Sequence, residues 1–81
     1  MRVAISPEEL HLLESEDETK DLLASLVVRE PSLALKGTGY PLAQLREACG
    51  DVLNRIGFDE NYNPNANGKM LEALIDRLFE A

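Results

Sequence analysis

Apolar residues recur every three or four positions along much of the chain, which is the spacing of α-helices that bury one face. The stripe is most regular from Leu42 to Ile56, and a broader one covers Met70 to Phe79. Aromatic residues are sparse, so the core is expected to consist mainly of leucine, isoleucine, valine and alanine. We predict an all-α domain of about four helices, with approximate bounds 7–16, 19–29, 41–56 and 64–80.

Local signals set the expected helix ends. Ser6, with Pro7 after it and Glu9 three positions on, forms a capping box with proline at the first helical position. Pro31 is expected to end the second helix, because proline disfavours helical geometry in the residue before it. Gly57 is expected to end the third helix in a left-handed conformation.

Two short stretches alternate between apolar and other residues, which is the pattern of a β-strand. They are 2–5 and 33–36, and we expect them to form at most a minor two-stranded element, with the conformation of 32–40 left open. One bent helix over 7–28 is the alternative to separate first and second helices. No internal repeat divides the chain, so 1–81 is expected to be a single small globular domain.

The chain is acidic, with 15 Asp and Glu residues against 8 Lys and Arg residues and a formal net charge of −7. Most of the imbalance lies between Glu8 and Asp21, where Lys20 is the only cation among many carboxylates. Nucleic acids and anionic membranes are bound through Lys and Arg, so we expect neither as a partner. A lone cysteine, Cys49, and the lack of a long apolar run favour a cytoplasmic protein.

Short motifs for metal binding lack their essential residues. Asp59, Asn61 and Asn63 match the start of an EF-hand calcium loop. Pro64, however, stands where that loop needs glycine, and Met70 stands where it needs a bidentate glutamate. A structural zinc site is excluded because the chain has one cysteine and one histidine. We expect neither a metal nor a cofactor.

No set of residues indicates catalysis. Cys49 falls within the apolar stripe of the third helix, where cysteine behaves as a small hydrophobic residue, and His11 is the sole imidazole. Carboxylates also occur four residues apart, an ordinary spacing on solvated helix faces; these pairs are Glu47–Asp51, Glu72–Asp76 and Asp76–Glu80. We therefore expect that the protein is not an enzyme.

The leading hypothesis is a non-enzymatic protein-binding module of the inhibitor, antitoxin, immunity or adaptor type. Carboxylates concentrated on a rigid helix can steer and dock a basic protein partner. The residues expected to form this contact are Glu14, Glu16, Asp17, Glu18 and Asp21.

The main alternative is a structural homodimer, or a subunit of a larger assembly, held by the apolar face of the C-terminal helix. That face consists of Met70, Leu71, Leu74, Ile75, Leu78 and Phe79. A third hypothesis, a small anionic-ligand binder, depends on the glycine-containing turn at Lys36–Gly39 just before a helix start.

Overall fold

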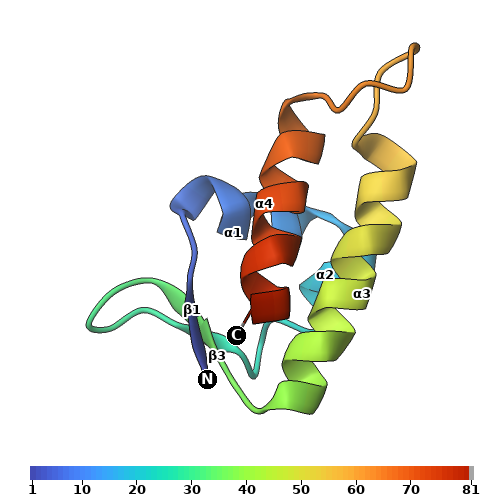
Figure 1. Ribbon diagram of the computed structural model, residues 1–81. Helices are drawn as coiled ribbons and strands as arrows, with labels where there is room; N and C mark the ends of the chain where they lie inside the picture. Colours follow the sequence, from blue (N-terminus) through green and yellow to red (C-terminus); the bar gives the residue numbers. More distant parts are fainter. Residues whose placement is uncertain (81) are drawn as a thin grey trace.

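Four helices account for most of the 1–80 segment that the computed structural model describes. The two longest, α3 (Gly39–Ile56) and α4 (Ala66–Glu80), run antiparallel and side by side (Figure 1). The shorter α1 (Pro7–Ser15) and α2 (Asp17–Lys20) pack against them. The mostly helical architecture expected from the hydrophobic pattern is thus present.

A small antiparallel sheet lies at the end of the molecule away from the α3–α4 connection (Figure 1). Its strands are β1 (Arg2–Ala4), β2 (Val27–Val28) and β3 (Ala34–Lys36), in the spatial order β1-β3-β2. Val3 lies opposite Leu35 in the β1–β3 pair, so the expected pairing of the two short alternating stretches is confirmed. The third strand was not predicted.

The predicted helix over 19–29 is wrong. Its helical part ends with α2, and the chain then follows turns into β2. Val27 and Val28 are β-branched and pair with β3, which satisfies their backbone groups in a conformation that suits valine. Leu23 and Leu26 are still buried, so the periodic leucines reach the core from turns.

A sharp break separates α1 from α2, so the single bent helix over 7–28 does not form. Glu16 is extended between them, with φ −106° and ψ 135°. The Thr19 hydroxyl donates to the Leu13 carbonyl at 2.6 Å, which satisfies an acceptor that the end of α1 leaves free. Thr19 is fully buried, and this bond holds α2 against the last turn of α1.

One hydrophobic core joins α1, the sheet, α3 and α4. Leucines from all four parts lie at its centre and have at most 1% of their surface exposed; they are Leu13, Leu35, Leu45, Leu71 and Leu74. In the part of the chain that the structure describes, every buried side-chain nitrogen or oxygen has a hydrogen-bond partner. The core therefore provides a rigid support for the outer surfaces of α3 and α4.

The close approach of α3 and α4 depends on two glycines where the helices meet. Gly57 does not adopt the left-handed conformation expected for it, since its φ is −85°. A Cβ atom added to Gly68 would lie 2.0 Å from the Gly57 carbonyl oxygen, so this crossing has no room for a side chain. Asn65 adds a second link, because its side chain donates to the Ile56 carbonyl at 2.7 Å and accepts from the Gly68 amide at 2.8 Å.

The connection between α3 and α4 is a tight hairpin that projects from the body of the molecule (Figure 1). The Asp59 carboxylate accepts from the amides of Asn61 and Asn63 at 2.8 and 3.0 Å. The Tyr62 amide donates to the Asp59 carbonyl at 3.0 Å, and Tyr62 itself has a φ of 61°. Tyr62 therefore has a left-handed backbone conformation, which residues other than glycine and asparagine seldom adopt.

Arg77 links the last helix to the first strand and the first helix. Ser6 and Glu9 form the expected capping box at the start of α1, with bonds of 2.8 and 3.1 Å. The Arg77 guanidinium donates to the Ala4 carbonyl at 2.6 Å and forms an ion pair with the Glu9 carboxylate. Glu9 is only 6% exposed, so its charge is compensated within the fold.

Candidate functional site

The acidic segment predicted as a docking site is partly occupied by contacts within the protein. Arg55 of α3 binds Glu16 at 2.5 Å and Glu18 at 2.8 Å, and these two carboxylates are only 19% and 24% exposed. The hydrogen bond from Arg55 lowers the pKa of Glu18, and the two carboxylates raise the pKa of Arg55. Glu16 and Glu18 therefore hold α2 against α3.

The other three residues of that segment remain at the surface. Asp17 forms an exposed ion pair with Lys20 at 2.9 Å, which lowers the pKa of Asp17 and raises that of Lys20. Glu14 and Asp21 are exposed. Glu14 lines an open groove of about 410 Å³ whose rim also carries the cations Lys20 and Arg29. Arg55 and Lys20 thus pair with three of the five carboxylates that the sequence selects, namely Glu16, Asp17 and Glu18.

The apolar face proposed for a dimer is divided between the core and two different surfaces. Leu71, Leu74 and Leu78 are 1%, 1% and 4% exposed, so they belong to the core. Met70 lines a groove between α1 and α4. Ile75 is half-buried and Phe79 is 72% exposed. The structure therefore does not bring these six residues together on one accessible surface.

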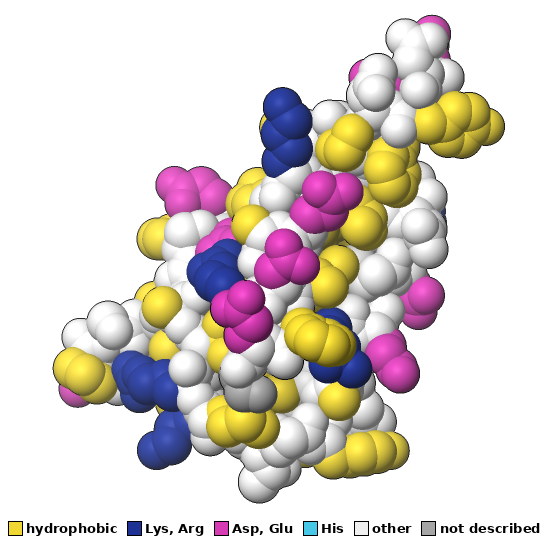
Figure 2. Space-filling view, viewed as in Figure 1, with side chains coloured by type: hydrophobic (Ala, Val, Ile, Leu, Met, Phe, Trp, Pro, Cys, Tyr) yellow, Lys and Arg dark blue, Asp and Glu magenta, His cyan; other side chains and the backbone are white. Residues whose placement is uncertain are grey.

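Apolar side chains instead gather along the junction of α3 and α4. The Gly57–Gly68 contact at one end and the Arg46 guanidinium, 5.1 Å from the Phe79 ring centre at the other, identify the sides that face each other. Helical spacing places Leu53 on this side of α3 and Ile75 on this side of α4. Figure 2 shows apolar atoms extending from the hairpin down between the two helices.

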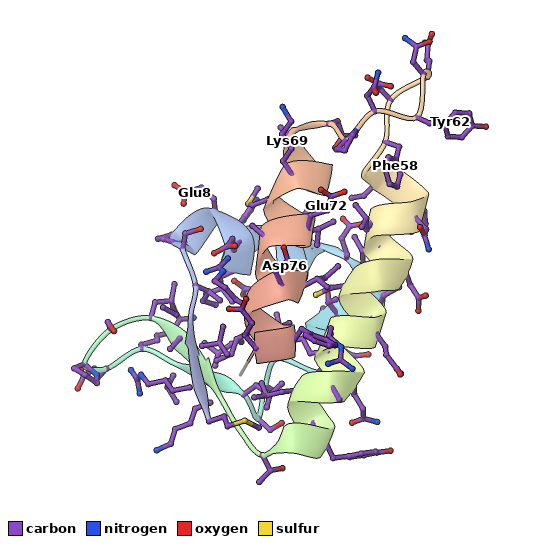
Figure 3. The ribbon with its side chains drawn as sticks, viewed as in Figure 1. Glu8, Phe58, Tyr62, Lys69, Glu72 and Asp76 are labelled. Atoms are coloured by element: carbon purple, nitrogen blue, oxygen red, sulfur yellow. The ribbon has the colours of Figure 1, made fainter. Side chains whose placement is uncertain are left out.

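We call this surface the α3–α4 face, defined by Leu53, Phe58, Tyr62, Ile75 and Phe79. Tyr62 and Phe79 are 87% and 72% exposed, while the other three are half-buried. Figure 3 shows Phe58 at the end of α3 and Tyr62 beside it on the hairpin. Exposed aromatic side chains that adjoin half-buried apolar ones are typical of surfaces that bind another molecule.

Two rows of carboxylates accompany the α3–α4 face. Glu72, Asp76 and Glu80 follow one another every fourth residue along α4 and are exposed; Figure 3 shows Glu72 and Asp76 on the side toward the viewer. Glu47 and Asp51 are exposed on the outer surface of α3. Within residues 1–80, none of these five forms an ion pair with a side-chain cation.

The sequence does indicate this second acidic surface, although the local net charge is most negative in a different segment, residues 8–21. The carboxylates four residues apart are visible in the chain, but their helices also carry cations, which hides them in a local charge count. Deciding which acids are neutralised requires the partners of Arg55 and Arg77, and these partners are 37 or more positions away.

His11 and Cys49, the sole imidazole and the sole thiol of the chain, lie in different surroundings. The groove of about 560 Å³ between α1 and α4 is lined by both His11 and Ser15. The Ser15 hydroxyl donates to the Leu12 carbonyl at 2.8 Å and to the Glu16 carboxylate at 3.2 Å, so it is directed to groups other than the His11 imidazole that would have to activate it. Cys49 is fully buried, and burial raises the pKa of its thiol to about 12. Along the described chain, no three His, Cys, Asp or Glu side chains are grouped so that they could hold a metal ion.

The turn at Lys36–Gly39 is engaged in backbone pairing. The Lys36 amide donates to the Leu26 carbonyl, and the Gly37 amide donates to the Met1 carbonyl at 3.1 Å. Two amides that an anion would need are therefore already used. Separately, none of the helices in residues 1–80 has the combination of length and apolar character needed to cross a bilayer.

No family model, no curated protein and no solved structure matches the chain.

Proposed function

We propose that the protein is a non-enzymatic binding module, of the inhibitor, antitoxin, immunity or adaptor type, that docks a basic protein through its α3–α4 face. The observation that carries this proposal is one surface with exposed aromatic residues at its two ends, Tyr62 on the hairpin and Phe79 in the last turn of α4. Glu72 and Asp76 lie along α4 between these ends (Figure 3), exposed and without an ion-pair partner among residues 1–80. Neither the segment at 14–21 nor the two open grooves combines these features.

Apolar and acidic parts of the face have different roles in binding. Phe79 and Tyr62 supply aromatic area that loses contact with water on docking, which is the usual source of affinity at a protein interface. Glu72, Asp76 and Glu80 supply a negative potential that attracts a basic partner and rejects an acidic one. Phe79 and the carboxylates lie on a packed pair of helices, and backbone hydrogen bonds to Asp59 hold the hairpin that carries Tyr62, so docking requires little ordering of the module.

A homodimer is the second candidate, because exposed Phe79 remains an apolar contact for another copy. In a two-fold symmetric dimer the same patch is present on both sides of the interface. The carboxylate row of α4 would then come close to the identical row of the second copy, and repulsion would oppose the contact at neutral pH. A basic partner meets no such repulsion and is therefore favoured.

The test is affinity capture from source-cell lysate at low and high salt with two matched triple variants. The first, Glu72→Gln/Asp76→Asn/Glu80→Gln, removes the α4 carboxylate row. The second, Glu14→Gln/Asp17→Asn/Asp21→Asn, makes the same charge change in the segment that sequence reasoning selected. Both sets are exposed, so both variants should fold as the parent does.

We expect a basic protein that is captured at low salt, released by high salt, lost with the first variant and retained by the second. Loss with the second variant alone would return the site to residues 14–21. Capture that neither variant affects would contradict docking through acidic groups of either surface.

A further inference from the structure

We infer that the segment of the partner that occupies the α3–α4 face is a cationic amphipathic α-helix, with an apolar stripe flanked by Lys or Arg. This inference rests on the proposed function and specifies the ligand of the same surface. Its basis is the juxtaposition of an apolar junction between two antiparallel helices with carboxylates on either helix.

The backbone of the partner decides between a helix and an extended chain. Most of the α3–α4 face is built from helices whose backbone groups bond within each helix, and the hairpin at its end is paired within itself through the Phe58–Pro64 bridge. The sheet edges β1 and β2 belong to another part of the molecule (Figure 1). An extended segment would find no backbone to pair with and would lose hydrogen bonds to water on docking. A helix satisfies its own backbone groups and avoids that cost.

The shape of the face also suits a helix. Side chains at the junction of α3 and α4 form an apolar strip at the surface (Figure 2), along which the ridge of side chains of a third helix can pack. Leu53, Ile75 and Phe79 line this strip. The 15 residues of α4 correspond to about 22 Å, so a partner helix of about four turns would cover the strip.

Charge defines the flanks of the partner helix. Glu72, Asp76 and Glu80 repeat every fourth residue, about 6 Å along α4, and cations four residues apart on a partner helix repeat at the same distance. Glu47 and Asp51 have the same spacing on α3. A helix with Lys or Arg on both sides of its apolar stripe can therefore pair with both rows. Two cations of the protein mark where cations of the partner are unfavourable: Lys69 near the start of α4 (Figure 3) and Arg46, whose guanidinium lies 5.1 Å from the Phe79 ring centre.

The experiment uses three synthetic peptides with the same net charge. The first two consist of leucine, alanine and lysine, and the third also contains proline. The first peptide places its leucines in one helical stripe with lysines on both sides. The second has the same composition in an order that spreads leucine around the helix. The third contains central prolines that prevent helix formation. Binding is measured by fluorescence anisotropy, and amide NMR shifts of the full chain locate the contact.

We expect the first peptide to bind at α3 and α4 and the other two to bind at least about tenfold more weakly. Glu72→Gln/Asp76→Asn/Glu80→Gln should weaken the first peptide by about tenfold, the combined effect of three partly exposed charge pairs. Phe79→Gln should weaken it comparably through the loss of apolar contact. The matched variant Glu14→Gln/Asp17→Asn/Asp21→Asn should leave its affinity within about twofold.

The alternative outcomes separate this inference from the proposed function. Equal binding of the proline peptide at the same residues would overturn the helix and leave the docking face intact. Binding of the first peptide that is insensitive to both the α4 triple variant and Phe79→Gln would overturn the face as well. Self-association in sedimentation runs, abolished by Phe79→Gln, would assign the face to a second copy of the chain.

Discussion

Tyr62 is an exposed aromatic residue whose backbone conformation is unfavourable for residues other than glycine. Its φ of 61° costs a side chain about 1–2 kcal/mol relative to glycine in this region, before the greater flexibility of unfolded glycine is subtracted. We therefore predict that Tyr62→Gly raises the free energy of unfolding by about 1 kcal/mol. That change corresponds to a rise in Tm of roughly 4–8 °C in a chain of this size.

Tyr62→Phe is the matched control for this prediction, because it keeps both the aromatic ring and the conformational cost. Thermal unfolding followed by circular dichroism should give the phenylalanine variant the Tm of the parent. A glycine variant that melts at or below the parent temperature would show that the loop carries no strain. If the α3–α4 face binds a partner as proposed, the more stable glycine variant should bind it less tightly.

Cys49 is predicted to be chemically silent in the folded protein. Its side chain is fully buried, and desolvation, with the nearby Glu9 carboxylate as a second cause, raises its pKa to about 12. The thiolate is the reactive form, so a disulfide reagent at mildly alkaline pH should not modify the native protein. Denaturant should release rapid reaction of this single thiol. Fast labelling without denaturant would contradict its burial.

At the scale of elements, Asn65 connects the end of α3 to the start of α4. Its amide nitrogen donates to Ile56 and its oxygen caps α4 through the Gly68 amide. Asn65→Ala should lower the free energy of unfolding by about 1–2 kcal/mol, because it removes the cap and leaves a partly buried carbonyl without its donor. Urea unfolding measures this loss as a lower midpoint.

Asn65→Asp separates the two roles of that side chain. Aspartate retains an oxygen that can cap α4, so this variant should lose less stability than Asn65→Ala. Equal losses in the two variants would assign the stabilisation to the Ile56 bond alone. Neither variant changes the charge rows of the α3–α4 face, so both are also suitable for testing whether the helix junction must be rigid for binding.

The contact between α2 and α3 gives a pH-dependent prediction. Arg55 lowers the pKa of Glu18 in the folded protein below its ordinary value of 4.5. The stabilisation is therefore fully present above that value and is lost as the pH falls through the lower folded pKa. Arg55→Met should destabilise the protein at pH 7, and its difference from the parent should shrink below about pH 4.5.

The control for this prediction is Arg29→Met, which removes an exposed cation that forms no ion pair among the described residues. Urea unfolding across the acidic range should show a nearly constant difference between this variant and the parent. A difference for Arg55→Met that grows with acidity would contradict the sign of the Glu18 shift.

At the scale of the whole molecule, Arg77 closes the fold by joining its first and last elements. Arg77→Leu leaves the Glu9 carboxylate, 6% exposed, without its cation and should cost about 3 kcal/mol. Arg77→Lys keeps the charge and should lose less. Adding Glu9→Gln to Arg77→Leu should restore part of the loss, which a double-mutant cycle in urea measures. Simple additivity of the two changes would show that the pair does not interact.

The architecture is predictable from the sequence where local patterns and packing agree. The capping box at Ser6 and the stripe of α3 follow from nearby residues, and β1 and β3 are each visible in the sequence as a short alternating stretch. The region 19–29 is different, because its leucines fit a helix while Val27 and Val28 pair with β3, which follows only six to eight positions later in the chain. Pairing between strands overrides a short periodic signal there.

The candidate site was harder to predict because it depends on contacts between residues that are far apart in the chain. Residues 14–21 are the most acidic stretch of the chain, yet Glu16 and Glu18 already form ion pairs with Arg55. The apolar face of α4 includes both Leu74, which is buried in the core, and Phe79, which is exposed to solvent. The folded structure determines which charged and which apolar side chains stay exposed and unpaired, and local sequence patterns do not predict this.

The pair between Glu9 and Arg77 also affects how the protein is made. The two residues are 68 positions apart, so at about 5–20 residues per second the ribosome adds Arg77 roughly 3 to 14 s after Glu9. During that time the nascent chain has a carboxylate that the finished fold buries but no cation to accompany it. The N-terminal strand and first helix therefore cannot reach their final packing while the chain grows, and they reach it only after the last helix has been synthesised.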